Sequence, residues 1–77
     1  MALITSFERS QKDRSQVHKP TRCSYSIVEG SGERYFQFDT YGSEDRQFGD
    51  KVSQSVQLTR AAAEQLIQLL REAFPGL

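Results

Sequence analysis

The clearest pattern in this chain is at its C-terminal end, where apolar residues recur with the spacing of one helix face. In the segment TRAAAEQLIQLLREAFPGL (59–77), the apolar positions are Ala62, Ala63, Leu66, Ile67, Leu70 and Phe74. This i, i+3, i+4 spacing predicts an amphipathic helix. Thr59 is suited to cap its first turn, and Pro75-Gly76 is suited to end it.

Three segments before this helix alternate between apolar and polar residues with period two, the pattern of β-strands. They are TRCSYSIVE (21–29), RYFQFDTY (34–41) and KVSQSVQL (51–58), and Gly30-Ser31-Gly32 predicts a turn between the first two. One face of the predicted sheet collects Cys23, Tyr25, Ile27, Phe36, Phe38, Val56 and Leu58. We expect the helix to cover this face, which gives an α+β fold: an antiparallel sheet of three or four strands with one C-terminal helix, a βββα meander.

The length of 77 residues fits one domain with a thin core, so self-association or a partner is a reasonable expectation. We expect residues 20–77 to form the α+β domain. Residues 1–19 are expected to be an N-terminal arm, partly mobile, or an edge element, in which Leu3, Ile4 and Phe7 could start a short helix or an edge strand.

The location of the protein is inferred from what the chain lacks. No apolar run approaches the roughly 18 residues that a membrane span needs. Glu8 and Arg9 interrupt the first apolar stretch too early for a secretory signal. The single cysteine, Cys23, agrees with a reducing compartment. We therefore expect a cytoplasmic protein without a membrane partner.

Ten basic and ten acidic residues cancel, but they are distributed unevenly. Residues 1–22 carry five positive and two negative side chains, a balance of +3. Residues 23–50 carry two positive and six negative side chains, a balance of −4. Such asymmetry suits a basic arm for an anionic partner, two ends that attract each other across a homodimer, or simply a solvated surface.

The stretch DTYGSEDRQFGD (39–50) has the length of a calcium-binding loop, but its chemistry differs. Such a loop needs oxygen ligands at positions one, three and five, glycine at six and glutamate at twelve. Position three is Tyr41, position six is Glu44 and position twelve is Asp50, and a strand precedes the loop where the motif requires a helix. We interpret the stretch as a connection between strands and expect no metal site.

Catalysis has few candidate residues in this sequence. His18 and Cys23 are the only residues of their kinds, and Cys23 falls on the predicted core face. The carboxylate pairs Glu44-Asp45 and Asp39 with Asp50 lie on a loop that nothing buries. The glycines do not lead from a strand into a helix N-terminus, as a phosphate-binding loop requires. We therefore expect a non-enzymatic protein without a cofactor.

The opposite face of the predicted sheet offers a better candidate site. It collects the rings, amides, hydroxyls and guanidinium of Arg22, Ser24, Ser26, Tyr35, Gln37, Tyr41, Ser53, Ser55 and Gln57, with Asp39 as the one negative charge. Bases of single-stranded nucleic acid stack on aromatic rings while cations contact the backbone. Exposed sheet faces are also polar for solvation alone, and tyrosines there can pack across strands or at a dimer contact.

The run YFQFDTYGSEDRQFGDKVSQSVQLTRAAAEQLIQLL (35–70) carries two resemblances. It is similar to small uncharacterised bacterial proteins with a DTYGS-x-DR pattern followed by KVSQS-x-QL, some labelled methionyl-tRNA formyltransferase-like, although the folate-binding and tRNA-binding domains of such an enzyme would need more than 77 residues. KVSQSVQLT (51–59), after Asp-Thr-Tyr-Gly-Ser, also resembles the strand-to-helix stretch of the positive cofactor four family of transcriptional coactivators. That resemblance implies a homodimer that binds single-stranded DNA on its sheet.

These observations lead to one functional hypothesis and one alternative. The hypothesis is a dimeric binding module for single-stranded DNA or RNA. Its contacts would come from Arg22, Tyr35, Gln37, Tyr41, Lys19 and Lys51. The alternative is a protein–protein interaction module or small accessory subunit that uses the same face for assembly, which the neutral overall charge favours.

Overall fold

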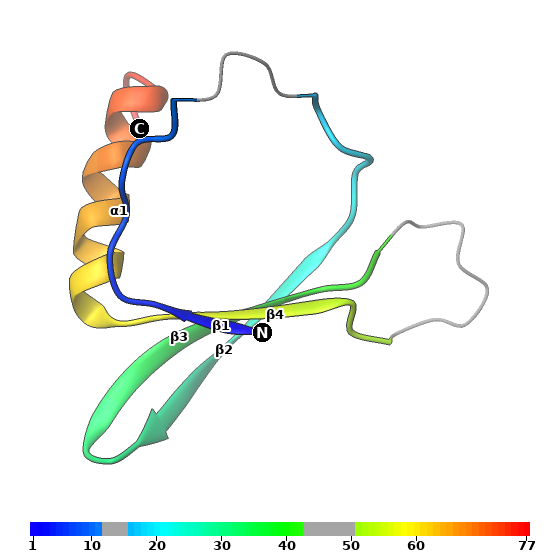
Figure 1. Cartoon of the computed structure of the whole chain (residues 1–77), viewed down its shortest axis with the longest axis vertical. Coiled ribbons are helices and arrows are strands. Elements are labelled where there is room, and N and C mark those ends of the chain that lie inside the picture. Colours follow the sequence, from blue (N-terminus) through cyan, green and yellow to red (C-terminus); the bar gives the residue numbers. More distant parts are fainter. Residues whose placement is uncertain (12–15, 43–50) are drawn as a thin grey trace.

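A computed structural model describes residues 1–11, 16–42 and 51–77 of the chain (Figure 1). The elements are β1 (Ala2–Ile4), β2 (Cys23–Gly30), β3 (Glu33–Thr40), β4 (Gln54–Leu58) and α1 (Arg60–Ala73). They form a four-stranded sheet in the order β1-β4-β3-β2 with one C-terminal helix, which confirms the predicted α+β class. No helix in these ranges combines the length and the apolar character that crossing a membrane requires.

Strands β2 and β3 form a hairpin that pairs from Cys23 opposite Thr40 to Gly30 opposite Glu33. Ser31 and Gly32 connect them with φ angles of 53° and 76°. Two successive positive φ angles are typical of a type I′ turn, whose twist matches that of the two strands. The turn predicted at Gly30-Ser31-Gly32 is confirmed.

The N-terminal residues supply the fourth strand. β4 pairs antiparallel with β3 on one side and parallel with β1 on the other, where Ala2 is opposite Val56 and Ile4 opposite Leu58. Of the alternatives predicted for residues 1–19, the structure shows the edge strand. Its parallel pairing with β4 differs from the antiparallel sheet that the sequence predicted. The segment after β1 is held to the helix, because the Phe7 amide donates to Gln65 Oε1 and Gln65 Nε2 donates to the Phe7 carbonyl, both at 2.7 Å.

The strand register places the predicted apolar residues on one face. Ile27 is opposite Phe36, which is opposite Leu58, and the next row along the sheet is Tyr25, Phe38 and Val56. Side chains alternate between faces along a strand, so these two rows share a face. The period-two pattern is confirmed for all three predicted strands.

Helix α1 begins and ends at the predicted signals. Thr59 has extended backbone angles, and its side-chain oxygen accepts a hydrogen bond from the Ala62 amide at 3.1 Å. This is an N-cap that satisfies one of the unpaired amides of the first turn. The helix ends at Ala73, just before Pro75 and Gly76, and Gly76 has a φ of 94°.

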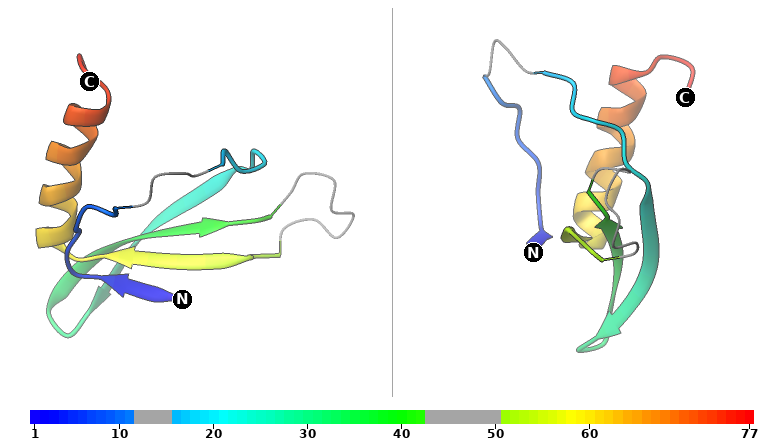
Figure 2. Two further views of the ribbon diagram at one scale, coloured as in Figure 1. Left: turned by 45° about the horizontal axis from the view of Figure 1, so that its top comes forward. Right: turned by 90° about the vertical axis from the view of Figure 1, so that its right-hand side faces the viewer.

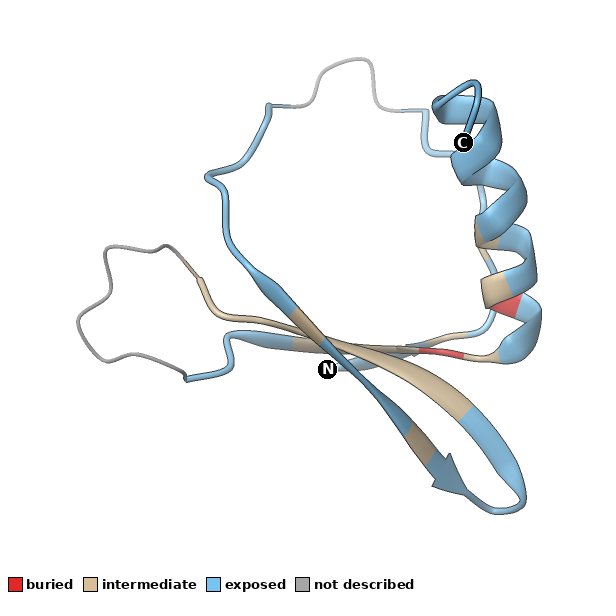
Figure 3. Cartoon of the chain, turned by 180° about the vertical axis from the view of Figure 1, so that it is seen from behind, coloured by how far each residue is buried: buried red, intermediate tan, exposed pale blue. Residues whose placement is uncertain are grey.

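The expectation that the helix covers the apolar sheet face is wrong for most of that face. Among the described residues only Leu58 and Ala62 are buried, at the junction of β4 and α1 (Figure 3). Tyr25 and Ile27 are 72% and 54% exposed. Cys23, which was predicted to lie in the core, is exposed.

The physical reason is the connection between strand and helix. β4 ends at Leu58 and α1 begins at Arg60, so Thr59 is the one residue between them. A connection this short gives the helix no length of chain in which to turn back across the sheet. The helix instead rises from the end of the sheet (Figure 2).

Candidate binding surfaces

The polar face of the sheet is organised by a row of side-chain hydrogen bonds on two neighbouring strands, β3 and β4. Gln57 Nε2 donates to Gln37 Oε1 at 2.8 Å, and Gln37 Nε2 donates to the Asp39 carboxylate at 3.1 Å. The Ser55 hydroxyl donates to the same carboxylate at 2.5 Å. All four residues are half-buried. The row holds the side chains of β3 and β4 in fixed orientations, and the carboxylate of Asp39 accepts hydrogen bonds from an amide and a hydroxyl.

Arg22 and Tyr41 meet at one end of this face. The guanidinium carbon of Arg22 lies 4.1 Å from the centroid of the Tyr41 ring, a cation–π contact. The Tyr41 hydroxyl is 2.6 Å from the hydroxyl of Ser24, which anchors the ring on β2. Two of the predicted site residues are thus brought together at the open end of the hairpin, where Arg22 precedes β2 and Tyr41 follows β3.

The other predicted contact residues are spread over the same face and its ends. Gln37 lies in the centre of the row described above. Lys19 and Lys51 are exposed, and they belong to the segments that enter β2 and β4 at the end of the sheet where Tyr41 follows β3. Tyr35 is half-buried and lies six residues from Tyr41, roughly 20 Å along an extended strand. The two tyrosines therefore do not form one platform.

A hollow of about 380 Å³ opens on the polar face beside β1. Its lining consists of Met1, Ala2, Leu3, Gln37, Ser55 and Gln57. One side of this hollow is apolar and the other carries two amides and a hydroxyl. Such a lining can accommodate a flat ring and form hydrogen bonds with its edge.

The opposite side of the molecule carries an uncovered surface that we call the apolar corner. Its sheet wall consists of Tyr25, Ile27, Phe36 and Phe38, which are exposed or half-buried. Its helix wall consists of Ala63, Ile67 and Leu70, whose spacing places them on one face of α1, and of Phe74, the residue that follows the helix. Between the walls lies a hollow of about 280 Å³, to whose lining Ile27, Phe36, Leu58 and Ala63 contribute.

Aromatic rings make the sheet wall continuous. The rings of Tyr25 and Phe36 stack with centroids 5.5 Å apart and planes within 12° of parallel. The ring of Phe38 meets that of Phe36 edge to face at the same centroid distance. Such pairs stabilise the hairpin, yet the outer face of Tyr25 stays in solvent.

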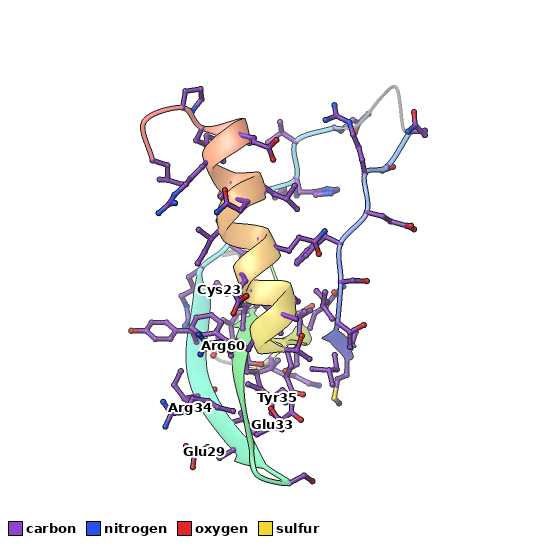
Figure 4. The ribbon with its side chains drawn as sticks, turned by 90° about the vertical axis from the view of Figure 1, so that its left-hand side faces the viewer. Cys23, Glu29, Glu33, Arg34, Tyr35 and Arg60 are labelled. Carbon is purple, nitrogen blue, oxygen red and sulfur yellow. The ribbon has the colours of Figure 1, made fainter. Side chains whose placement is uncertain are left out.

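Two ion pairs within the described part of the chain lie beside the corner. Arg34 donates to Glu29 at 2.9 Å near the hairpin turn (Figure 4). Arg60 donates to Glu64 at 2.9 Å in the first turn of the helix. Both pairs are largely exposed, so each contributes little to stability. The carboxylate-bearing residue Glu33 also contributes to the lining of the hollow between the walls.

The sequence pattern placed Tyr25 and the helix wall in the core, so it missed the apolar corner as a surface. The signal that could have revealed it is the length of the strand-to-helix connection. KVSQSVQL runs into TRAAAEQ with only Thr59 between the two patterns. Because a helix that continues directly from a strand points away from it, the far part of both apolar faces stays uncovered.

The residues considered for catalysis and metal binding are not brought together. His18 and Cys23 are both exposed, and no hydrogen bond joins them in the part of the chain that is described. In those same ranges, no group of three or more His, Cys, Asp or Glu side chains could hold a metal ion. Most of the loop weighed as a calcium site, with Glu44, Asp45 and Asp50, lies outside the described residues.

Comparisons with known proteins give no further assignment: no family model, curated protein or solved structure matches this chain.

Proposed function

We propose that this protein is a non-enzymatic binding module that holds single-stranded nucleic acid on the polar face of its sheet. The observation that carries the proposal is the stack of the Arg22 guanidinium on the Tyr41 ring, at 4.1 Å, at the end of the sheet that Lys19 and Lys51 approach. A guanidinium plane offers a stacking surface for a base and donors for a phosphate at once.

The other contacts follow from the layout of the face. Gln37 and Gln57 line the hollow beside β1, where their amides can hydrogen-bond to the edge of a base without strict sequence preference. Lys19 and Lys51 supply exposed cations for phosphates. A bound oligonucleotide contacts Tyr35 only if it is long enough to follow β3 toward the hairpin turn.

The test is fluorescence anisotropy of a labelled, mixed-sequence single-stranded oligonucleotide, with the matching duplex as a second ligand. We expect the single strand to bind more tightly than the duplex. Tyr41→Ala should weaken binding by about 5-fold to 150-fold, because one stacked base contributes about 1–3 kcal/mol. With Arg22, Lys19 and Lys51 as the phosphate contacts, the log–log salt dependence should have a slope no steeper than about −2.

Two matched variants separate a specific contact from a change in charge or fold. Arg22→Gln should weaken binding, whereas Arg34→Gln removes the same charge near the hairpin turn, away from Tyr41, and should leave the affinity unchanged. Tyr41→Phe keeps the ring, so it should bind far better than Tyr41→Ala. Absence of binding at low salt, or equal losses for Arg22→Gln and Arg34→Gln, would rule out the proposed site.

A protein–protein interaction module or accessory subunit is the second candidate, and the exposure of the apolar corner favours it. Surfaces of this kind mark places where another polypeptide binds. This candidate predicts that variants on the polar face change no assembly, while variants in the corner do. Size measurements on Tyr41→Ala and Tyr25→Ala would distinguish the two faces.

A further inference from the structure

The two walls of the apolar corner, one on the sheet and one on the helix, are both left exposed by the chain that carries them. Ile67 and Phe74 on the helix wall are 48% and 61% exposed, and Tyr25 on the sheet wall is 72% exposed. A helix and a sheet that are each apolar on one side normally bury those sides against each other. Here α1 follows β4 after the one residue Thr59 and rises from the end of its own sheet (Figure 2).

The amount of uncovered surface exceeds what a single folded chain of this size exposes. The accessible surface is 7136 Å², whereas a monomer of 8.8 kDa is expected to expose about 4,800 Å². The radius of gyration is 14.6 Å, against about 11.5 Å for a compact chain of 77 residues. This difference belongs to the chain as a whole, and the exposed side chains of the corner, Tyr25, Ile27, Ile67 and Phe74, contribute to it.

We propose that a second copy of this chain covers the apolar corner, so that α1 of each copy packs on the sheet wall of the other about a two-fold axis. The two walls of one chain are complementary in kind, a helix stripe and an aromatic sheet face, so a two-fold arrangement buries both pairs at once. The chain has a formal net charge of zero, so two copies do not repel each other at long range. Only Leu58 and Ala62 are buried in the described part of one chain, so a single copy has a very small core. A second copy of the same chain is always present to bury the remaining apolar side chains.

The proposal is tested by sedimentation equilibrium of the full chain and of single variants on the two walls. The wild type should sediment at twice the chain mass of 8.8 kDa. Ile67→Lys on the helix wall and Tyr25→Glu on the sheet wall should each raise the dissociation constant by at least about 100-fold, because each places a charge in an apolar contact. Val17→Glu is the matched control: Val17 is 99% exposed outside the corner, and this variant should remain dimeric.

A mixture of the two wall variants makes the test independent of how each folds alone. In a mixed dimer, the unchanged helix of Tyr25→Glu meets the unchanged sheet of Ile67→Lys, and the substituted lysine meets the substituted glutamate. Mixing equal amounts should therefore restore the mass of a dimer and the far-ultraviolet circular dichroism of the wild type.

Three results would overturn the proposal. They are a wild type that is a folded monomer at tens of micromolar concentration, a Tyr25→Glu variant that remains dimeric, and a mixture that stays monomeric. A monomer whose affinity for single-stranded nucleic acid depends on Tyr25 would instead assign the sheet wall to base stacking. The dimer does not depend on the nucleic-acid proposal, because Arg22 and Tyr41 lie on the opposite face and are tested by anisotropy.

Discussion

Thr59 joins three parts of the molecule at one residue. Its side-chain oxygen accepts from the Ala62 amide at 3.1 Å, and its own amide donates to the Ile4 carbonyl at 3.1 Å. The first bond caps the helix and the second continues the pairing of β1 with β4. The N-cap at Thr59 was predicted from the sequence, because it depends only on a threonine that directly precedes a helical pattern. Its bond to Ile4 could not be predicted, since 55 residues separate the two.

Thr59→Ala removes the cap and the 3.5 Å hydrogen bond from the Thr59 hydroxyl to the Ile4 carbonyl, but it keeps the backbone bond between these two residues. We expect it to lower the free energy of unfolding by about 1 kcal/mol. Thr59→Ser retains the hydroxyl and should stay near wild type. Chemical denaturation at one fixed protein concentration measures both, and equal stability of the alanine and serine variants would show that the cap contributes nothing.

Among the elements, the strands were more predictable than their surroundings. Period-two alternation identified β2, β3 and β4 and the residues on each face, because that pattern is local. β1 has three residues, too few for a period, and its partner strand is more than fifty residues away. The same limit applies to the candidate site: alternation placed Arg22 and Tyr41 on one face, but their contact depends on the register of the hairpin.

A side chain of the helix contacts the segment between β1 and residue 11 at Phe7. Gln65 both accepts from and donates to the backbone of Phe7. Gln65→Ala should therefore speed amide exchange at Phe7 by about tenfold, the equivalent of roughly one lost hydrogen bond. Gln68→Ala, an exposed glutamine one turn along the helix, serves as the control. Unchanged exchange at Phe7 in the Gln65 variant would mean that this pair of bonds does not hold the segment.

At the scale of the whole molecule, the two proposals assign different roles to the two sides of the sheet. We propose that the apolar corner pairs with a second copy, which leaves the polar face outside that contact and open to a ligand. Helix coverage could not be predicted from the apolar pattern, because a pattern tells which side chains need burial and not which chain supplies the cover. Leu66, Leu70 and Phe74 satisfy the same spacing whether they pack within the chain or against a partner.

A fold that is completed by its partner has a stability that depends on protein concentration. Dissociation accompanies unfolding, so mass action favours the folded dimer as concentration rises. The melting temperature should therefore rise by roughly 8–10 °C over a 100-fold increase in concentration, taking the unfolding entropy of two 77-residue chains. Tyr41→Ala, on the polar face, should show the same dependence as wild type.

The measurement that tests the paired fold most directly is this concentration series, followed by circular dichroism from about 2 to 200 µM. We expect the melting temperature of the wild type to rise across the series. We expect no such rise for Tyr25→Glu. A melting temperature that stays within about 1 °C over the whole range would contradict it, because a chain that folds without its partner has no dependence on concentration.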